Sequence, residues 1–173
     1  MKNWPCLIAV CLCCTATGAM AKQPVPTAVF DFGFDDTSLQ GAVQGKRADE
    51  QHRLMALNVE LRDMLVKSGC CEIADLGIVA EQAEGIDMRT CNGCDVDLAR
   101  KAGARISVTG WVQKVSNLIL NINLVVRDVD AGQLISAGSV DLRGNTDESW
   151  SRGLSYLLDN RLHPSQWTLR EAP

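Results

Sequence analysis

The stretch that decides the fold is ISVTGWVQKVSNLILNINLVVRDVDAGQLISAGSVDL, residues 106–142. Its pattern predicts three strands joined by short polar turns, at Ile106–Val115, Asn117–Val129 and Leu134–Leu142. Side chains alternate between the two faces of a strand. In the middle strand, this alternation gathers one apolar set on a single face: Leu118, Leu120, Ile122, Leu124 and Val126. An antiparallel meander with one apolar face needs helices to cover that face.

Helices suited to this task are predicted before and after the meander. Apolar residues at helical spacing predict a helix from Ala48 to Lys67, which ends at Ser68-Gly69. Asn145, three residues before Glu148, resembles a capping box. The helix that begins there has one apolar side that can cover the sheet: Trp150, Leu154, Leu157, Leu158 and Leu162.

Shorter elements complete the predicted fold. Thr27–Phe34 predicts a first strand whose three phenylalanines point to one face, and Cys70–Leu76 predicts another strand. Asp35–Gly45 is expected to be a loop, whereas Ile78–Ile86 and Asp95–Ala102 are expected to be short helices. The order β-α-β-(α)-α-β-β-β-α predicts a single α/β (α+β) domain. Its mixed sheet contains an antiparallel C-terminal meander and has helices packed on it.

The first 21 residues have the order of a secretory signal peptide. Lys2 is followed by a short apolar run, Leu7–Cys14, and then by the small residues of Ala19-Met20-Ala21. The run is shorter than the roughly 20 residues that span a bilayer. We therefore expect an exported, periplasmic protein cleaved after Ala21. Residues 22–163 then form one domain, and residues 164–173 form a loosely held tail.

The composition is that of a globular domain with a mild acidic excess. Of the 173 residues, 46% are hydrophobic, and the formal net charge is -4. Basic residues are scattered rather than clustered, which argues against nucleic acid or an anionic membrane surface as a partner. The sequence contains no complete catalytic motif and no cofactor motif. We therefore expect neither enzyme activity nor a cofactor.

Four cysteines remain after the leader: Cys70, Cys71, Cys91 and Cys94. An even number of cysteines in an exported protein favours disulfides. We expect bridges between the 70/71 pair and the 91/94 pair, which would close a loop of about 20 residues and stabilise the fold by roughly 3 kcal/mol. Three connectivities remain open.

Cys91-Asn92-Gly93-Cys94 also permits a metal or thiol-redox role. A helix N-terminus lowers the pKa of a thiol, although Asp95 and Asp97 oppose thiolate formation. Met88 lies three residues before Cys91 and adds a third soft ligand. This alternative ranks behind structural disulfides.

Polar residues of the meander and its flanks predict a partner-binding surface. The candidate residues are Trp111, Lys114, Asn121, Asn123, Arg127, Arg143 and Asn145. Asparagine has poor β propensity, so a local partner must satisfy these side chains. The alternative is the solvent side of a sheet that is buried on one face only. Asp35-Asp36 is expected to be a solvated turn rather than a cation site.

Several of these segments resemble known families. "CNGCDVDLARKAGA", "GWVQKVSNLILNIN" and "DLRGNTDESWSRGL" resemble an exported bacterial family catalogued only as a domain of unknown function. "LVKSGCCEIADL" and residues 99–136 more distantly resemble the TolB amino-terminal domain and the curli-secretion lipoprotein family. The resemblance implies an envelope α/β domain that docks on other proteins, with a link to quinoprotein alcohol oxidation. We expect a non-enzymatic accessory domain whose partner is a periplasmic or envelope protein.

Overall fold

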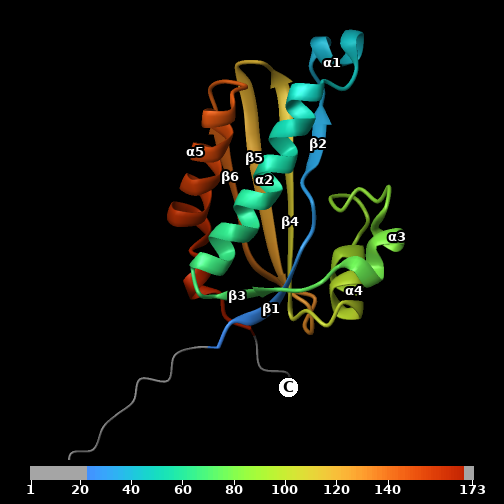
Figure 1. Ribbon diagram of the computed structural model, residues 1–173, viewed down its shortest axis with the longest axis vertical. Helices are drawn as coiled ribbons and strands as arrows, with labels where there is room; N and C mark the ends of the chain where they lie inside the picture. The colour runs from blue at the N-terminus through green and yellow to red at the C-terminus, as the bar shows by residue number, and fades with distance from the viewer. Residues whose placement is uncertain (1–22, 170–173) are drawn as a thin grey trace, which may run out of the picture.

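Three long antiparallel strands form one side of the sheet in the computed structural model, which describes residues 23–169 (Figure 1). They are β4 (Ile106–Ser116), β5 (Ile119–Asp128) and β6 (Leu134–Leu142). The predicted meander is confirmed, and β6 has the predicted bounds. The predicted signal peptide lies outside the described residues.

Three short parallel strands extend this meander into a mixed, six-stranded sheet. They are β1 (Val25–Val29), β2 (Gly33–Asp36) and β3 (Cys71–Ile73). The strand order is β3-β1-β4-β5-β6, and β2 pairs with β4 beyond the end of β1. The predicted fold class, a mixed sheet with helices packed on it, is therefore confirmed.

The single strand predicted for Thr27–Phe34 is wrong, because a register shift divides it into β1 and β2. Val29 pairs with Val108, and Gly33 pairs with Trp111. The chain thus advances four residues while β4 advances three. One extra residue reverses the alternation of side chains. Phe30 consequently packs on one face of the sheet, whereas Phe32 packs on the other.

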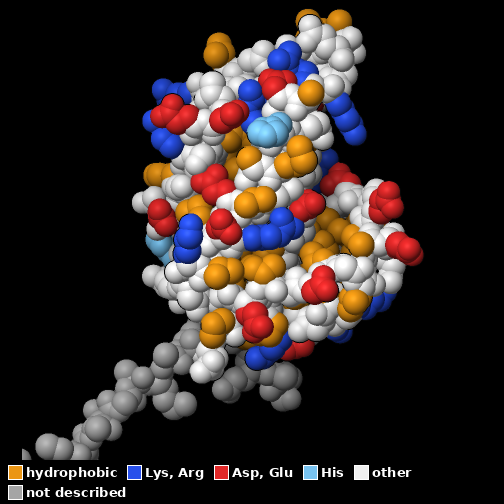
Figure 2. All heavy atoms as spheres, viewed as in Figure 1, with side chains coloured by type: hydrophobic (Ala, Val, Ile, Leu, Met, Phe, Trp, Pro, Cys, Tyr) orange, Lys and Arg blue, Asp and Glu red, His pale blue; other side chains and the backbone are white. Residues whose placement is uncertain are grey.

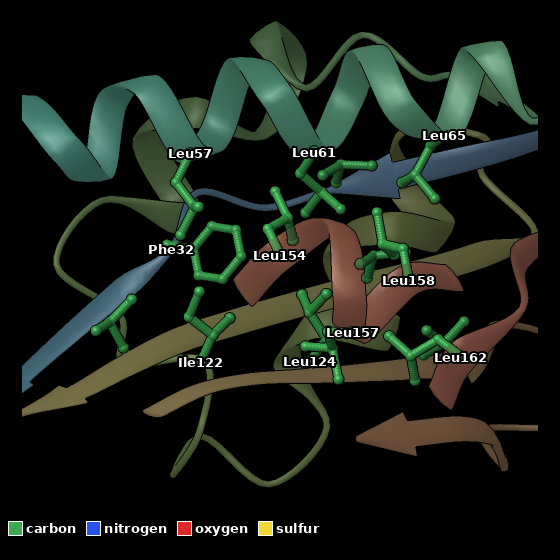
Figure 3. Packing of buried hydrophobic residues seen from close by; sticks show 14 of the residues in the cluster. Phe32, Leu57, Leu61, Leu65, Ile122, Leu124, Leu154, Leu157, Leu158 and Leu162 are labelled. Carbon is green, nitrogen blue, oxygen red and sulfur yellow. The ribbon is translucent and has the colours of Figure 1, made fainter. Parts of the chain in front are cut away.

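Two helices cover one face of the sheet and enclose the main core (Figures 1 and 3). Helix α2 (Ala48–Lys67) has the predicted bounds. Helix α5 (Asp147–Leu157) continues as a π-helical turn, Leu158–Leu162. Its N-cap is Thr146, whose Oγ1 accepts a hydrogen bond from Ser149 N, and not the predicted Asn145. Figure 3 shows leucines of both helices pointing at Phe32 and at the strands.

Smaller elements cover part of the opposite face. Helix α4 (Cys94–Lys101), a 3-10 turn (Gly77–Val79) and helix α3 (Ala80–Ala83) surround a second apolar cluster with β1. A short helix α1 (Leu39–Gln44) replaces part of the predicted loop, because the Ser38 side chain caps it by accepting from Gly41 N. Within residues 23–169, none of the helices is long and apolar enough to cross a membrane.

The described part of the C-terminal tail is packed on the domain. Pro164–Gln166 form a 3-10 turn, and the Trp167 side chain is only 4% exposed. Trp167 Nε1 donates to the carbonyl oxygen of Leu162 at 2.8 Å. A loose tail was predicted from residue 164 because this segment lies beyond the last predicted helix, whose end Pro164 marks. The indole of Trp167 nevertheless joins the main core.

Candidate functional site

The far side of β4, β5 and β6 forms a half-exposed polar surface, which we call the open face. Strand pairing aligns Trp111 with Asn123 and Ser139, and it aligns Gln113 with Asn121 and Asp141. These side chains point away from α2 and α5, because the intervening residues of each strand fill the main core. The open face therefore consists of six residues: Trp111, Gln113, Asn121, Asn123, Ser139 and Asp141.

Amide side chains on the open face satisfy one another. Asn123 Nδ2 donates to Asn121 Oδ1 at 2.5 Å, and Asn121 Nδ2 approaches Gln113 Oε1 at 3.5 Å. These hydrogen bonds are the local partners that asparagines in a strand were expected to need. We call this row of side chains the amide ladder. It also holds polar groups at fixed positions beside the half-buried indole of Trp111.

Arg127 lies on the same side of the sheet, where α4 meets it. Its Nε lies 3.8 Å from Asp95 Oδ2, and the buried Asp95 carboxylate accepts a hydrogen bond from Ser107 Oγ at 2.9 Å. The first turn of α4 is thereby anchored to β4 and β5. Asp95, expected to oppose a thiolate, instead binds the sheet.

The predicted recognition surface is divided between two faces, and Lys114 is on the wrong one. Lys114 pairs with Leu120, so alternation turns its side chain into the core, where it is fully buried. Asn145 also faces inward, since its Nδ2 donates to Glu50 Oε1 at 2.6 Å. Arg143 follows the end of β6 and is exposed. The structure thus brings Trp111, Asn121 and Asn123 together, with Arg127 beside them.

Lys114 is the centre of a buried polar network that the sequence analysis missed. Its Nζ donates to Glu50 Oε1 at 2.7 Å, Asp36 Oδ2 at 3.1 Å and Gln40 Oε1 at 3.2 Å. Burial opposes the charge of Lys114, but the hydrogen bonds to Glu50 and Asp36 outweigh burial and raise the pKa of Lys114. Glu50 lies one turn before Leu54 on the apolar stripe of α2. A carboxylate on the apolar stripe of a helix indicates a buried cation, and this was the signal in the sequence that could have predicted the network.

The adjacent aspartates of β2 are held by different cations. Asp36 points into the buried network, while Asp35 Oδ2 accepts from Arg89 Nη1 at 2.8 Å. Arg89 also pairs with Asp87, so it ties the loop before α4 to β2. The expected solvated turn is therefore a strand with paired carboxylates. Within residues 23–169, no group of three or more His, Cys, Asp or Glu side chains is arranged to hold a metal.

The cysteines are joined within each pair rather than between pairs. Cys70 bonds to Cys71 at the start of β3, and Cys91 bonds to Cys94 at the start of α4. The expected long-range bridges are therefore replaced by links between sequence neighbours. Each link closes a very short loop, so it restricts the unfolded chain less than the expected loop of about 20 residues would.

Met88 contacts the second disulfide. Its Sδ lies 3.6 Å from Cys94 Sγ, and Cys91 Sγ lies 3.7 Å from the carbonyl oxygen of Met88. Three sulfur atoms thus gather at the start of α4. The methionine also packs against the second apolar cluster.

A separate groove of about 840 Å³ runs between α3 and the chain that links β1 to β2. We call it the β2-edge groove. Its walls include residues 29–33, residues 74–77 and Arg62 of α2, and the segment around α3 adds Ala80, Glu81, Ala83, Glu84, Ile86 and Met88. Figure 2 shows apolar side chains on its floor and acidic side chains around it. This groove could not be predicted from the sequence, because it depends on how β1 and β3 diverge.

Comparison with solved structures places the fold among known domains. The LpoB C-terminal domain from Salmonella enterica is 15% identical, with a TM-score of 0.50 over 72% of this chain and 87% of that chain. A point variant of PelC from Paraburkholderia phytofirmans, solved as a dodecamer, is 14% identical, with a TM-score of 0.50 over 83% of this chain and 90% of that chain. At such identities, the likeness concerns the fold alone.

Sequence comparison gives the family. No curated protein matches the chain. A family model, DUF3280, described as "Protein of unknown function (DUF2380)", matches residues 25–162. This match includes every strand of the sheet, the open face and the β2-edge groove, and it confirms the predicted membership of a family of unknown function. The chain therefore belongs to the DUF3280 family.

Proposed function

We propose that this protein is a non-enzymatic accessory domain of the cell envelope that docks a partner protein on its open face. The observation that carries the proposal is a sheet with one covered face and one half-exposed face, on which Trp111 lies beside a fixed amide ladder. Tryptophan is enriched among the residues that dominate binding energy at protein interfaces.

The surroundings of Trp111 support this role. Val115 and Ile119, at the β4–β5 end of the open face, are 50% and 60% exposed. Apolar side chains beside preorganised hydrogen-bonding groups match the composition of a protein interface. Because hydrogen bonds already order Asn121 and Asn123, these side chains would lose little further conformational entropy when a partner binds.

An envelope location is supported by the predicted signal peptide and by cysteine chemistry. Disulfides form and persist in oxidising compartments such as the periplasm. Both cysteine pairs of the domain are joined as disulfides. The link to quinoprotein alcohol oxidation stays a prediction.

Site-specific photo-crosslinking tests the open face in the organism's own periplasm. A photoreactive residue at the exposed Ser139 of the open face should crosslink to a partner protein, whereas one at the exposed Glu148 of α5 should not. Adding Trp111→Ala to the Ser139 variant should abolish the crosslink. Equal crosslinking from both positions would contradict the proposal.

A second variant distinguishes docking from self-association. We expect Asn121→Ala/Asn123→Ala/Arg127→Ala to lose capture of the partner while keeping a cooperative unfolding transition, with a midpoint lowered by loss of the contact between Arg127 and Asp95. Retained capture by this variant would exclude the open face. The PelC structure is a dodecamer, so light scattering should also measure the oligomeric state of this protein. A crosslink that forms only to another copy of the chain would mean that the open face mediates self-association and does not dock a different protein.

The second candidate function is soft-metal binding after reduction, favoured by the 3.6 Å contact between Met88 Sδ and Cys94 Sγ. A dithiol reductant would supply two electrons and two protons to the Cys91–Cys94 bond, giving two thiols. Thiolates and a thioether prefer Cu(I). Cu(I) competition against a chromogenic chelator should then show one site in reduced protein, lost in Cys91→Ser/Cys94→Ser and kept in Cys70→Ser/Cys71→Ser.

A further inference from the structure

The β2-edge groove has the features of a peptide site distinct from the open face. We infer that it binds an extended, basic segment of a partner protein. This inference goes beyond docking on the open face, because the groove lies at the other edge of β4 and is lined by different residues. Its support comes from an unpaired strand edge, an apolar floor and an acidic rim.

The strand edge is unpaired because β1 and β3 run together only briefly. Their pairing ends at Thr27 and Ile73, followed by one further hydrogen bond from Ala74 N to the carbonyl oxygen of Thr27. The chain then leaves for α3, and β2 pairs only with β4. Beyond Thr27, the β1–β2 chain therefore has a sheet partner on one side only.

Side chains of α2 take the place of the absent strand. Phe32 N donates to Asn58 Oδ1 at 2.8 Å, and Arg62 Nη2 donates to the carbonyl oxygen of Val29 at 3.0 Å. Backbone groups in this position are a template for an added strand. An extended peptide can replace these side-chain contacts with main-chain hydrogen bonds. The groove is therefore better suited to a peptide than to a small molecule.

The floor of the groove supplies apolar contact. Phe30, Leu76 and Met88 are buried or half-buried, and Ile86 is 37% exposed. The groove's volume of about 840 Å³ lies within the usual range of binding pockets. In an extended segment, alternate side chains point the same way, so apolar residues at every second position could contact this floor.

The charged residues at the rim of the groove favour a basic ligand. Four carboxylates line the groove, those of Asp31, Asp75, Glu81 and Glu84, against one cation, Arg62. Arg62 is already paired with Asp31 at 2.6 Å. Among the described residues, none of the hydrogen bonds or ion pairs involves the side chain of Glu81 or Glu84. Some exposed carboxylates elsewhere do have cations, as Asp97 has Arg100 and Glu148 has Arg152. Lysine or arginine side chains would complete the rim.

Fluorescence anisotropy of labelled octapeptides tests the assignment. The probes are a set in which Lys alternates with Val, Leu or Phe, and a matched set in which Glu replaces Lys. At low salt, at least one basic probe should bind the intact chain saturably, and its affinity should fall as salt increases. Failure of every basic probe, or equal binding of its acidic counterpart, would overturn the inference.

Charge-reversal variants locate the site. Glu81→Lys/Glu84→Lys should weaken binding of the basic probe by about tenfold or more. The matched control, Glu148→Lys/Asp159→Lys, changes the net charge equally on the exposed surface of α5 and its continuation, and it should leave binding nearly unchanged. Equal weakening in both variants would mean non-specific attraction and would contradict the groove.

Backbone measurements distinguish strand addition from side-chain contact alone. On binding, the amides of residues 31–34 should gain protection from hydrogen exchange, while those of the open-face strand β5 should not change. Protection of β5 in place of residues 31–34 would move the site to the open face. Because Trp111→Ala leaves the groove intact, it should bind the basic probe normally, so failure of the docking proposal does not affect this result.

Discussion

Lys114 Nζ lies 2.7 Å from Glu50 Oε1, and both side chains are fully excluded from water. The pair links the end of β4 to the first turn of α2. Asn145 extends it to α5, since it donates to Glu50 Oε1 and accepts at Oδ1 from Trp150 Nε1 at 3.1 Å. One end of the domain is thus held together by polar contacts, whereas its centre is held by leucines.

Lys114→Met should destabilise the domain strongly, because it leaves Glu50 buried without its cation. Breaking a buried pair by removing one partner costs about 3–5 kcal/mol. The other oxygen of this carboxylate, Glu50 Oε2, is already without a hydrogen-bond partner among the described residues. Urea unfolding of the variant measures the loss of unfolding free energy.

The double variant Lys114→Met/Glu50→Leu is the control. Removing both charges should recover at least about 1 kcal/mol relative to Lys114→Met, since the uncompensated carboxylate is gone. An equally destabilised double variant would show that packing volume, rather than the charge pair, determines the loss.

Acid should weaken the same network through Asp36. Burial of Asp36 opposes its charge, but hydrogen bonds from Ser38 and Lys114 outweigh burial and hold the pKa of Asp36 below its ordinary value of 3.8. The unfolded chain then binds more protons near that pH than the folded domain. The stabilisation is therefore present above pH 3.8 and is lost as the pH falls through the lower, folded-state pKa.

Urea unfolding of wild type and Asp36→Asn, measured from pH 7 down to about pH 3, tests this pH dependence. The difference in unfolding free energy between wild type and variant should stay constant near neutrality and shrink in the acidic part of the range. Asp141→Asn is the matched control, because it removes an exposed carboxylate that lies outside the buried network. A difference that is constant down to the acidic limit would contradict a charge-linked role for Asp36.

The predictable parts of the fold are those that local periodicity determines. Helix α2 has one apolar residue every three or four positions, so its bounds follow from Leu54 to Leu65 and the Ser68-Gly69 stop. The meander follows from alternation alone, because its turns are short and polar. Helical spacing and strand alternation can each be recognised within one continuous segment of the chain, without knowledge of contacts to distant segments.

The unpredicted parts depend on contacts between segments. The register shift between Val29 and Gly33 can be recognised only against β4, and it changes the face on which Phe32 lies. Lys114 was assigned to the polar surface by its residue type, although its position opposite Leu120 places it inside. Within the candidate site, alternation places Trp111, Asn121 and Asn123 on one face, and the β4–β5 register then pairs Trp111 with Asn123. Their role as a binding surface stays a prediction.

Peptide mapping should distinguish the two cysteine arrangements directly. Trypsin cleaves after Lys67, Arg89 and Arg100, so the 70/71 pair and the 91/94 pair fall in separate peptides, 68–89 and 90–100. With bridges inside each pair, unreduced protein should yield two separate peptides, each lighter by two hydrogen atoms than its reduced form. A single crosslinked species of the two peptides would instead support bridges between pairs.

Loss of the Cys91–Cys94 bridge should lower stability by less than loss of a long-range bridge would. A loop of four residues stabilises the folded state by about 2 kcal/mol in the chain-entropy model, below the roughly 3 kcal/mol of a 20-residue loop. Cys91→Ser/Cys94→Ser should therefore keep a cooperative urea transition with a modestly lower midpoint. A variant that no longer folds would show that the bridge has a larger role in holding the loop with Met88 and Arg89.

The two tryptophans Trp111 and Trp150 should respond oppositely to replacement by alanine. Trp150 is 1% exposed and packs against Phe34, with ring centroids 6.1 Å apart, so its loss should cost about 3–5 kcal/mol of unfolding free energy. Trp111 is half-buried on the open face, so its loss should cost less unfolding free energy than the loss of Trp150. Partner crosslinking should instead be lost in Trp111→Ala and kept in Trp150→Ala, when both variants are tested under conditions in which they are folded. If Trp111→Ala destabilised the domain as much as Trp150→Ala, the indole would be part of the core, and the open face would lose its main binding residue.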